Sequence, residues 1–361
     1  MERRRVCCFC EIWENGGIEA FLAGILTQMD LTSLQVDIVA TQLEENSLTE
    51  SLRQRGVRFV PLSGNTRNLP KNARMFRKII RDRQYDVLHL NLYQGLSLFY
   101  ARIARQEGIP IRIAHSHNSD LRPSPGRSLK LLLHRMGRLF FEPDVTHRWA
   151  CSHPAGEFLF AKPFRMIPNG IQTEDFAFDP TVRQKIRRNL DVRDQILLGN
   201  AGRLCTQKNQ RFLLDVLARL PKNYVLALAG EGEDRQMLEK RIEQLGLRDR
   251  VMLLGHCRQV PALMQGMDLY LLPSLFEGFP LSAIEAQAAG LPILCADTLS
   301  REINITDRVE FLPLEAALWA QRIQEIPLTR QKDAQGVLAR AGFSRQAVAK
   351  EIENTYREVI G

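Results

Sequence analysis

The sequence predicts an α/β protein built from two doubly wound parallel sheets. Short apolar or β-branched runs alternate with segments of helical period from one end of the chain to the other. The alternation is interrupted once, by the polar segment 173–191, and then starts again. At 361 residues, 45% of them hydrophobic, the chain is long enough for two domains. We therefore expect two Rossmann-like domains that face a cleft.

The expected strands fall into two groups, one on each side of the polar segment. In the first half they are residues 5–10, 36–41, 57–62, 87–91, 112–116, 149–152 and 165–167. In the second half they are residues 196–201, 225–230, 251–255, 269–273, 293–297 and 309–313. The predicted domains are residues 1–167 and 168–342. A last amphipathic segment, residues 343–361, is expected to form a helix that packs on one of them.

The composition excludes several classes of protein. No apolar run approaches the roughly 20 residues that span a bilayer, and Glu11 and Glu14 interrupt the start of the chain too early for a signal peptide. Seven cysteines without regular spacing suit a reducing compartment, so we expect a cytoplasmic protein. Cys7 and Cys10 have the spacing of redox and zinc sites, but no second pair accompanies them, and they also fit a buried first strand.

The net charge of +8 is concentrated in two stretches of the first half, residues 67–83 and 122–138. In the second stretch and the three residues after it, basic residues are interspersed with leucine, methionine and phenylalanine, as in an amphipathic helix on an anionic membrane. A core helix with a solvated basic face is the alternative. Neither stretch carries a nucleic-acid-binding motif, so we expect no nucleic acid partner.

Two glutamates mark the most informative turn of the chain. A strand ends near residue 273, and a helix is predicted from about Pro280 to Ala289, with Gly290 as its C-terminal cap. Glu277 then lies in the loop over the carboxyl end of a strand, where open α/β sheets bind ligands, and Glu285 lies in the helix.

The start of this helix is also a predicted anion site. The backbone N–H groups of Gly278, Phe279 and Leu281 would point at the ligand. Carboxylates accept hydrogen bonds from sugar hydroxyls. An anion site beside two carboxylates therefore indicates a nucleotide-sugar.

A second turn provides cations. The strand 196–201 is followed by Gly202, Arg203 and Lys208, which open a helix. An arginine fork and a lysine near a helix N-terminus suit a diphosphate. A solvated loop with incidental charges is the alternative.

Two further patterns lie in the first half. Gly16 and Gly17 follow the first strand, where glycines let the backbone approach a ligand, although a plain tight turn has the same sequence. His115 and His117 stand at the end of a strand without an evident third metal ligand. A hydrogen-bonding or acid/base role and a structural role both remain open for them.

The motifs together resemble one family. In chain order they are Asn15-Gly-Gly-Ile-Glu19, His115-Ser-His-Asn118, Asn169-Gly170-Ile171, Gly202-Arg203 with Lys208-Asn209, Gly230-Glu-Gly232, Glu277-Gly-Phe-Pro280 and Glu285-Ala-Gln-Ala-Ala-Gly290-Leu-Pro292. The chain resembles family 4 of the retaining glycosyltransferases, which have the GT-B fold. Within that family it is similar to bacterial capsular and exopolysaccharide transferases of the EpsF type.

The resemblance implies a role for each motif. Glu277 would hold hydroxyls of the donor sugar and Glu285 the ribose, while Arg203 and Lys208 bind the diphosphate and stabilise the leaving group. The other donor-binding positions that it implies are Gly202, Gly278, Phe279, Pro280 and Leu281. Gly16 and Gly17 would close over the phosphates and the acceptor. His117, or alternatively His115, would lie near the reacting sugar.

The resemblance also implies a reaction. A sugar would move from a nucleotide-diphosphate-sugar, expected to be a UDP-sugar, to a lipid-linked oligosaccharide or polysaccharide precursor in exopolysaccharide or capsule synthesis. No metal and no cofactor are expected, because arginine and lysine take the place of a metal. Front-face departure and attack would retain the configuration, and a covalent route through Glu277 stays open. The segment 343–361 would cross back to the first domain.

Two other functions fit the same motifs. One is a GT-B nucleotide-sugar epimerase or a soluble sugar synthase. The other is a non-enzymatic, anion-binding protein associated with a membrane. The leading expectation is a cytoplasmic transferase that lies peripherally on the inner face of the plasma membrane and uses a lipid-linked glycan acceptor.

Overall fold

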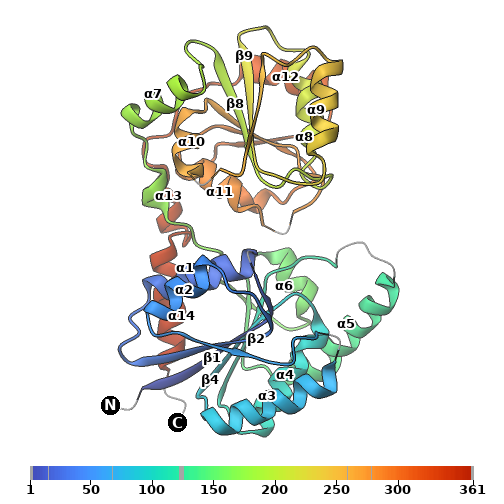
Figure 1. Ribbon diagram of the computed structural model, residues 1–361, viewed down its shortest axis with the longest axis vertical. Coiled ribbons are helices and arrows are strands. Elements are labelled where there is room, and N and C mark those ends of the chain that lie inside the picture. The colour runs from blue at the N-terminus through green and yellow to red at the C-terminus, as the bar shows by residue number, and fades with distance from the viewer. Residues whose placement is uncertain are drawn as a thin grey trace. The chain divides into compact units, whose positions relative to one another are not determined.

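The protein divides into two compact units in a computed structural model that describes residues 3–14, 16–66, 68–121, 126–257, 259–277 and 279–358. Unit 1 comprises Met1–Gly170 and Arg345–Gly361, and unit 2 comprises Ile171–Ser344 (Figure 1). The chain changes units at 170/171 and 344/345, two or three residues beyond the expected boundaries at 167/168 and 342/343. The units match GT-B structures in fold, as the comparisons below report.

The sheet of unit 1 has seven parallel strands in the order β3-β2-β1-β4-β5-β6-β7. Their bounds are β1 Arg4–Trp13, β2 Leu34–Leu43, β3 Arg58–Pro61, β4 Val87–Leu92, β5 Ile111–Ser116, β6 His147–Ala150 and β7 Arg165–Met166. Each overlaps an expected strand. The order reverses between β1 and β4, which places the switch point of this sheet at their carboxyl ends.

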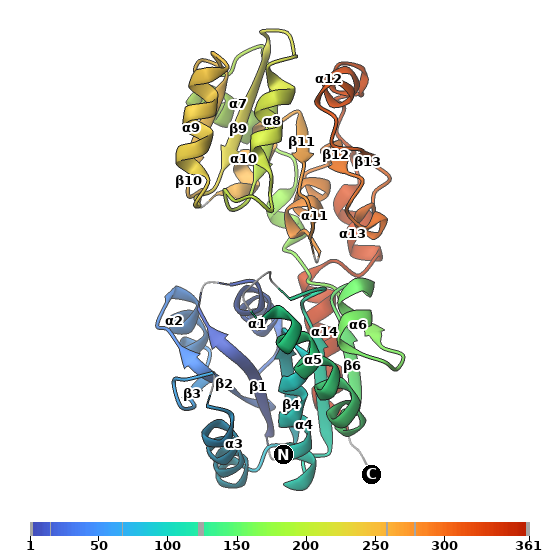
Figure 2. The ribbon, with the colours of Figure 1, turned by 90° about the vertical axis from the view of Figure 1, so that its right-hand side faces the viewer.

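Apolar cores cover both faces of this sheet. Along β1, Cys8 and Cys10 belong to one core, whereas Cys7 and Phe9 belong to the other. The first core is closed by α1 Gly17–Gln28, α2 Ser47–Gln54 and α14 Arg345–Arg357, the second by α3 Leu69–Arg83 and α4 Phe99–Gln106 (Figure 2). Because Cys7 and Cys10 are fully buried and point to opposite faces, the Cys-x-x-Cys spacing is structural here.

The last helix belongs to unit 1. Val348, Ile352 and Tyr356 recur at four-residue spacing on one face of α14 and are buried in the core with α1 and β1. The remaining elements of unit 1 are α5 Arg127–Phe141, α6 His153–Leu159 and two 3₁₀ turns, η1 Gly95–Leu98 and η2 Glu142–Asp144.

Unit 2 has six parallel strands in the order β10-β9-β8-β11-β12-β13. Their bounds are β8 Ile196–Ala201, β9 Tyr224–Ala229, β10 Val251–Gly255, β11 Leu269–Leu272, β12 Ile293–Ala296 and β13 Val309–Leu312. Here the order reverses between β8 and β11, so the loops after these two strands flank the switch point. The cations predicted after β8 and the glutamate predicted after β11 are thereby brought to one edge.

Helices cover both faces of the second sheet as well. One core contains side chains of α8 Gln210–Leu217, α9 Arg235–Gln244 and α12 Ala316–Glu325. The other contains α10 Val260–Gly266, α11 Leu281–Ala288, α13 Ala334–Arg340 and the turn η3 Thr173–Phe176, with α7 Pro180–Asn189 packed against it. A last 3₁₀ turn, η4, spans Arg301–Ile303. None of the helices in the described ranges is long and apolar enough to span a membrane.

The two chain crossings run beside each other. On the unit 1 side, a Cβ on Gly170 would lie 2.8 Å from the Cα of Arg345, which is tighter than a side chain tolerates. On the unit 2 side, Ile171 bridges Ser344 in parallel, and its N–H donates to the carbonyl of Phe343 at 2.9 Å. Glycine at position 170 therefore permits the close pairing of the crossings.

Candidate functional site

The loops after β8 and β11 are bound to each other in unit 2. The N–H of Leu275 donates to the carbonyl of Gln207 at 2.8 Å, and the Gln207 side chain donates to the carbonyl of Phe276 at 3.0 Å. Asn209 donates to the carbonyl of Pro273 at 3.2 Å. The two loops therefore form one structure at the switch point.

Lys208 and Glu277 form an ion pair in this structure. Lys208 Nζ lies 2.6 Å from Glu277 Oε1, and the two side chains are only 19% and 9% exposed. A Cβ on Gly202 would lie 3.4 Å from Lys208 Cε, so this glycine leaves room for the lysine stem. The cation predicted for the diphosphate and the carboxylate predicted for the sugar thus reach the same point.

A pocket of about 400 Å³ opens at the Gly202 turn, against which the Lys208 stem packs. Three predicted residues line it: Gly202, Arg203 and Glu285. Arg203 lies 3.0 Å from Glu233, and both side chains are more than half exposed. An exposed ion pair of this kind contributes little, so Arg203 is available to an anion.

Sequence analysis gave no role to the other wall of this pocket, although Glu231 stands in the motif Gly230-Glu-Gly232. Glu231 follows β9, and His256 and Cys257 follow β10. The rule that ligands bind at the carboxyl ends of strands, applied to all strands of the second half, would have found them.

Tyr270 was also missed, although it supports the site. Its buried hydroxyl donates to the carbonyl of Ala201 at 3.0 Å and accepts from the Ala201 N–H at 3.1 Å, which fixes the end of β8. Burial raises the Tyr270 pKa, and the charges of Glu285 and Glu277 raise it further, so both carboxylates act on this hydroxyl. The signal in the sequence is one phenol within an otherwise apolar strand.

The start of α11 differs from the prediction. Pro280 is not the first helical residue but the N-cap, with φ −75° and ψ 97°, and α11 begins at Leu281. The ring of Phe279 stacks on Phe343 at 5.6 Å, so its side chain packs in the core of unit 2. Gly278 lies outside the described residues, and the anion site at this helix start stays a prediction.

The glycine turn of unit 1 is held by a carboxylate. Glu19 is buried, which raises its pKa, while the backbone N–H groups of Glu19, Glu14 and Gly16 lower it by hydrogen bonding. At Gly17 a Cβ would meet nothing within 4 Å, so that position is open.

A buried hydrogen-bond chain runs through unit 1. The Tyr356 hydroxyl lies 2.6 Å from His89 Nδ1, His89 Nε2 lies 3.3 Å from His115 Nδ1, and His115 Nε2 lies 3.3 Å from the carbonyl of Ile167. A carbonyl oxygen only accepts, so His115 Nε2 donates to Ile167 and the neutral His115 ring accepts at Nδ1. His89 Nε2 therefore donates to His115, and His89 Nδ1 accepts from the Tyr356 hydroxyl. His115 is fully buried with both nitrogens occupied, so the prediction that it contacts the donor is wrong in this structure.

His117 lies two residues after His115, just past the last residue of β5 at the carboxyl edge of the sheet. Its Nε2 donates to Asn91 Oδ1 at 3.0 Å, because the Asn91 amide nitrogen faces two backbone carbonyls at 3.4 Å. Its Nδ1 has no donor among the described residues, and neither has the neighbouring Asn169 Oδ1. Burial lowers the His117 pKa to about 3, opposed by the Asn169 side chain. His117 is therefore neutral, and its Nδ1 is buried next to the Asn169 side chain.

Burial of these histidines makes stability depend on pH. Burial lowers the pKa of His89 and His117 to about 3 and that of His115 well below its usual value, whereas in the unfolded chain they titrate near 6.5. The free energy of unfolding should be constant above pH 7. Below about pH 6.5 it should fall by up to about 1.4 kcal/mol per pH unit for each histidine, down to pH 3.

Urea unfolding at pH 7.0, 6.0 and 5.5 measures this slope. The variant His153→Gln, which changes an exposed histidine, should keep it. A slope equivalent to less than one proton between pH 6.5 and 5.5 would contradict the assignment of neutral buried rings.

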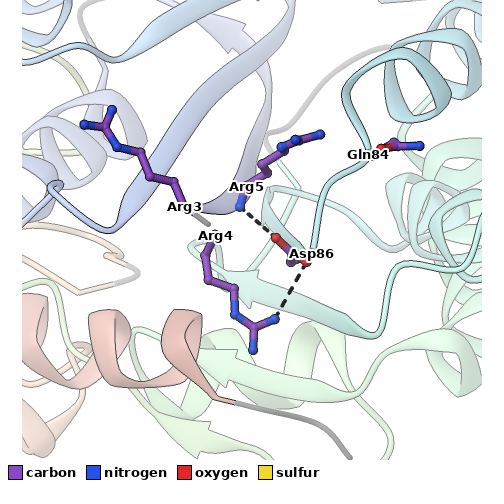
Figure 3. Close-up of a pocket in the computed structure, with 5 residues that line it drawn as sticks. All are labelled: Arg3, Arg4, Arg5, Gln84 and Asp86. Atoms are coloured by element: carbon purple, nitrogen blue, oxygen red, sulfur yellow. Dashed lines mark hydrogen bonds and ion pairs between the residues drawn. The ribbon is translucent and has the colours of Figure 1, made fainter. Parts of the chain in front are cut away.

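A different pocket lies at the opposite edge of the unit 1 sheet. It measures about 390 Å³ and is lined by Arg3, Arg4, Arg5, Gln84 and Asp86 (Figure 3). Asp86 accepts from the Arg5 N–H at 2.8 Å and lies 3.7 Å from Arg4. These residues surround the amino end of β1, away from the carboxyl ends where the predicted site residues gather.

The predicted residues thus form two groups. Unit 2 brings together Gly202, Arg203, Lys208, Glu277 and Glu285, and unit 1 presents Gly17 and His117. No group of three potential metal-ligating side chains occurs within the described part of the chain.

Two doubly wound units of this kind make up the GT-B fold. The family described as Glycosyltransferase Family 4 matches residues 15–175, and the one described as Glycosyl transferases group 1 matches residues 182–311. The chain belongs to these family 4 glycosyltransferases, which confirms the resemblance of its motifs.

Relatives that match over most of their length agree with this assignment. The chain is 27% identical over 374 residues to the putative glycosyltransferase EpsF of Bacillus subtilis, covering 98% of this chain and 96% of the relative. It is 27% identical over 289 residues to the UDP-Gal:alpha-D-GlcNAc-diphosphoundecaprenol alpha-1,3-galactosyltransferase of Escherichia coli, covering 74% and 73%. The structure of Anabaena HepE in complex with UDP has the same fold, with TM-score 0.79, 20% identity and coverage of 98% and 99%.

Proposed function

We propose that this glycosyltransferase moves a sugar from a UDP-sugar to a lipid-linked glycan precursor, with retention of configuration and without a metal ion. The observation that carries the proposal is the contact between Lys208 and Glu277 beside the pocket of Arg203 and Glu285. It puts two cations and two carboxylates around one ligand site. That combination suits a ligand with a diphosphate between two sets of hydroxyls.

The donor would bind as follows. Glu285 accepts from the ribose hydroxyls, and Arg203 and Lys208 bind the diphosphate. Lys208 exchanges Glu277 for phosphate, which frees Glu277 to accept from hydroxyls of the sugar. Structures of HepE with UDP and with UDP-glucose, which share the fold, support a uridine nucleotide as the donor carrier. The two cations supply the charge that a metal ion supplies elsewhere.

The proposed step breaks the bond between the sugar C1 and the phosphate oxygen, whose electrons leave with UDP. The acceptor oxygen attacks C1 from the same face, and its proton passes to the departing phosphate. Glu277 positions the sugar rather than attacking it.

The relatives support the acceptor class. The name of the Escherichia coli relative gives a sugar diphosphate on a polyprenol as acceptor. Its similarity extends over 74% of this chain. We therefore place the reaction in bacterial exopolysaccharide or capsule assembly, with the acceptor anchored in a membrane.

Product analysis tests this proposal. UDP-glucose, UDP-galactose and UDP-N-acetylglucosamine, each radiolabelled, are incubated with the protein alone and with GlcNAc-diphosphate on a short lipid chain. We expect label in the lipid product, release of UDP and no loss of rate with EDTA. An epimerised nucleotide-sugar formed without acceptor would instead identify an epimerase. If calorimetry detects no UDP binding, the assignment of the donor site is wrong.

Helix α5 supports a peripheral membrane position. Its large exposed apolar side chains form one stripe, the apolar stripe of α5: Leu129, Leu132, Met136, Leu139 and Phe140. Arg127, Lys130 and Arg135 are exposed on the same helix. Residues 122–125, part of the predicted basic stretch, lie outside the described residues. Apolar and basic side chains on one exposed helix suit an anionic lipid surface.

Flotation with vesicles tests the membrane contact. The protein should float with phosphatidylglycerol vesicles at low salt and less at high salt, because salt screens the basic residues. Leu132→Ser with Leu139→Ser should abolish flotation. Phe178→Ser, which changes an exposed apolar side chain of unit 2, should leave it unchanged. If all variants float equally, α5 does not contact the membrane and the proposed peripheral position is wrong.

A further inference from the structure

A second face of α5 borders a pocket that the donor site does not use. The pocket measures about 440 Å³ and lies between α5, α6 and the residues that follow β5. Its chemically distinctive lining residues are Asp120, His134, Arg135, Arg138, Glu157 and Phe158. Since β5 and β6 end beside it, the pocket lies at the carboxyl edge of the unit 1 sheet, as His117 does.

His134 lines this pocket but has a structural role, because both of its ring nitrogens are bonded to the backbone. Its Nδ1 accepts from the Gly95 N–H at 2.9 Å, so its Nε2 donates to the carbonyl of Phe158 at 2.8 Å. Its ring also stacks on Phe158 with centroids 4.1 Å apart. With both nitrogens occupied, His134 is neutral and has no proton to exchange with a ligand.

The charges around His134 favour an anion with hydroxyl groups. Burial lowers the His134 pKa, the carbonyl of Phe158 opposes this, and the charges of Arg138 and Arg135 lower it further, so both guanidinium groups act on the pocket. Asp120 is neutralised by Arg127 at 2.8 Å. Arg135, Arg138 and Glu157 have no ion pair among the described residues, although Arg138 donates to a backbone carbonyl. Two cations and one free carboxylate remain for a ligand.

Arg135 also adjoins the apolar stripe of α5. It lies three residues after Leu132 and four before Leu139, and residues at these spacings are neighbours on a helix surface. Leu132 and Leu139 are 54% and 71% exposed. An anion held by Arg135 therefore has uncovered apolar surface directly beside it. A free sugar phosphate would leave that surface bare, whereas a lipid chain covers it.

Helix α5 is held firmly in this orientation. Gly137 of α5 packs directly on the backbone of Gly95, where a Cβ on either residue would collide with backbone atoms of the other element. Arg138 donates to the carbonyl of Phe160 at 2.6 Å from the same side. The pocket and the apolar stripe therefore keep their places on two sides of one helix.

We infer that this pocket binds the head group of a lipid-linked sugar diphosphate, the acceptor class on which the proposed function rests. The diphosphate lies on Arg135 and Arg138, and the adjoining sugar donates hydroxyl hydrogen bonds to Glu157. The apolar chain runs along Leu132 and Leu139 into the membrane. The ligand thus bridges the two faces of α5.

Farnesyl diphosphate, used below its micelle concentration, is the probe for the lipid-diphosphate part. We expect calorimetry to show one site, with Arg135→Ala weakening binding about tenfold, as for loss of one charge-assisted contact. Lys130→Ala removes one charge from the same helix outside the pocket lining and should bind as wild type. Farnesol and inorganic diphosphate, each with half of the required chemistry, should bind more weakly than farnesyl diphosphate. Equal affinity of Arg135→Ala and wild type overturns the inference.

The source of the anion is tested separately. If phosphatidylglycerol vesicles bind with the same dependence on Arg135 and Lys130 as farnesyl diphosphate, the basic residues serve the membrane surface and the pocket assignment fails. Glu157→Gln should weaken GlcNAc-diphosphate on a short lipid chain and leave farnesyl diphosphate unchanged. If Glu157→Gln binds both ligands as tightly as wild type does, the proposed contact between Glu157 and the sugar is wrong.

UDP binding, measured on the same variants, separates this inference from the proposed function. Arg135→Ala and Glu157→Gln should bind UDP as wild type does, because the donor residues lie in unit 2. If wild type fails to bind UDP but binds farnesyl diphosphate through Arg135, the donor proposal fails and the pocket stands. The reverse pattern keeps the donor site and rejects the pocket. Both substituted side chains are exposed, so the melting temperature should not change.

Discussion

Lys208→Ala should lower kcat by about 10²–10³-fold at saturating donor, the usual cost of removing one group that stabilises transition-state charge. Lys208 is the better placed of the two cations, since it is largely buried and already in contact with the carboxylate predicted to hold the sugar. Its loss removes positive charge from the leaving diphosphate and leaves Glu277 without its ion-pair partner. Initial rates of UDP release measure the effect.

A double-variant cycle separates catalysis from this local repulsion. Glu277→Gln removes the negative charge, so Lys208→Ala made in that background tests the lysine without an unpaired carboxylate. The rate loss should persist. Lys240→Ala, on the exposed side of α9, is the control for loss of one positive charge in unit 2. A kcat within threefold of wild type in Lys208→Ala would exclude Lys208 from the diphosphate site.

Gly230→Ala should destabilise the protein by about 3 kcal/mol, through backbone strain and a collision. Gly230 has φ +146°, which side chains rarely adopt, and its Cβ would run into the carbonyl oxygen of Gly202. The two turns are also paired, because the Gly202 N–H donates to the carbonyl of Ala229 at 2.9 Å. The substitution therefore pushes the β8 turn, and the affinity for UDP should fall with the stability.

Gly246→Ala is the matched control for the backbone conformation. Gly246 has φ +64°, but a Cβ there would meet nothing within 4 Å. It should cost only about 1 kcal/mol, the price of the left-handed conformation alone. Thermal unfolding of both variants measures the difference. Equal losses would show that the contact between the Gly202 and Gly230 turns is unimportant.

The strands of this protein are predictable from sequence because they are buried on both faces. A parallel strand covered by helices reads as a short apolar run, and every described strand overlaps such a run. These apolar runs do not predict the order of the strands in the sheets. The pairing of β8 with β11 joins two strands that β9 and β10 separate in the sequence, so the contact between Lys208 and Glu277 is visible only in the structure.

The site residues show the same limit. Motifs identify Arg203 and Glu285, but His256 and Cys257 stand in no motif and join the pocket because β10 extends the same edge. His115 and His117 are equivalent in a sequence pattern. Only the structure distinguishes them, because β5 ends between them: His115 is inside the sheet layer and His117 is beyond it.

The paired crossings bring two distant parts of the sequence back to one place. Gly170 lies against Arg345, and Ile171 bridges Ser344, so the chain leaves and re-enters unit 1 at one place. The hydrogen-bond chain from Tyr356 to the carbonyl of Ile167 joins α14 to the segment that leads into the first crossing. Unit 1 therefore cannot complete its core until the chain has been made through α14, after the whole of unit 2.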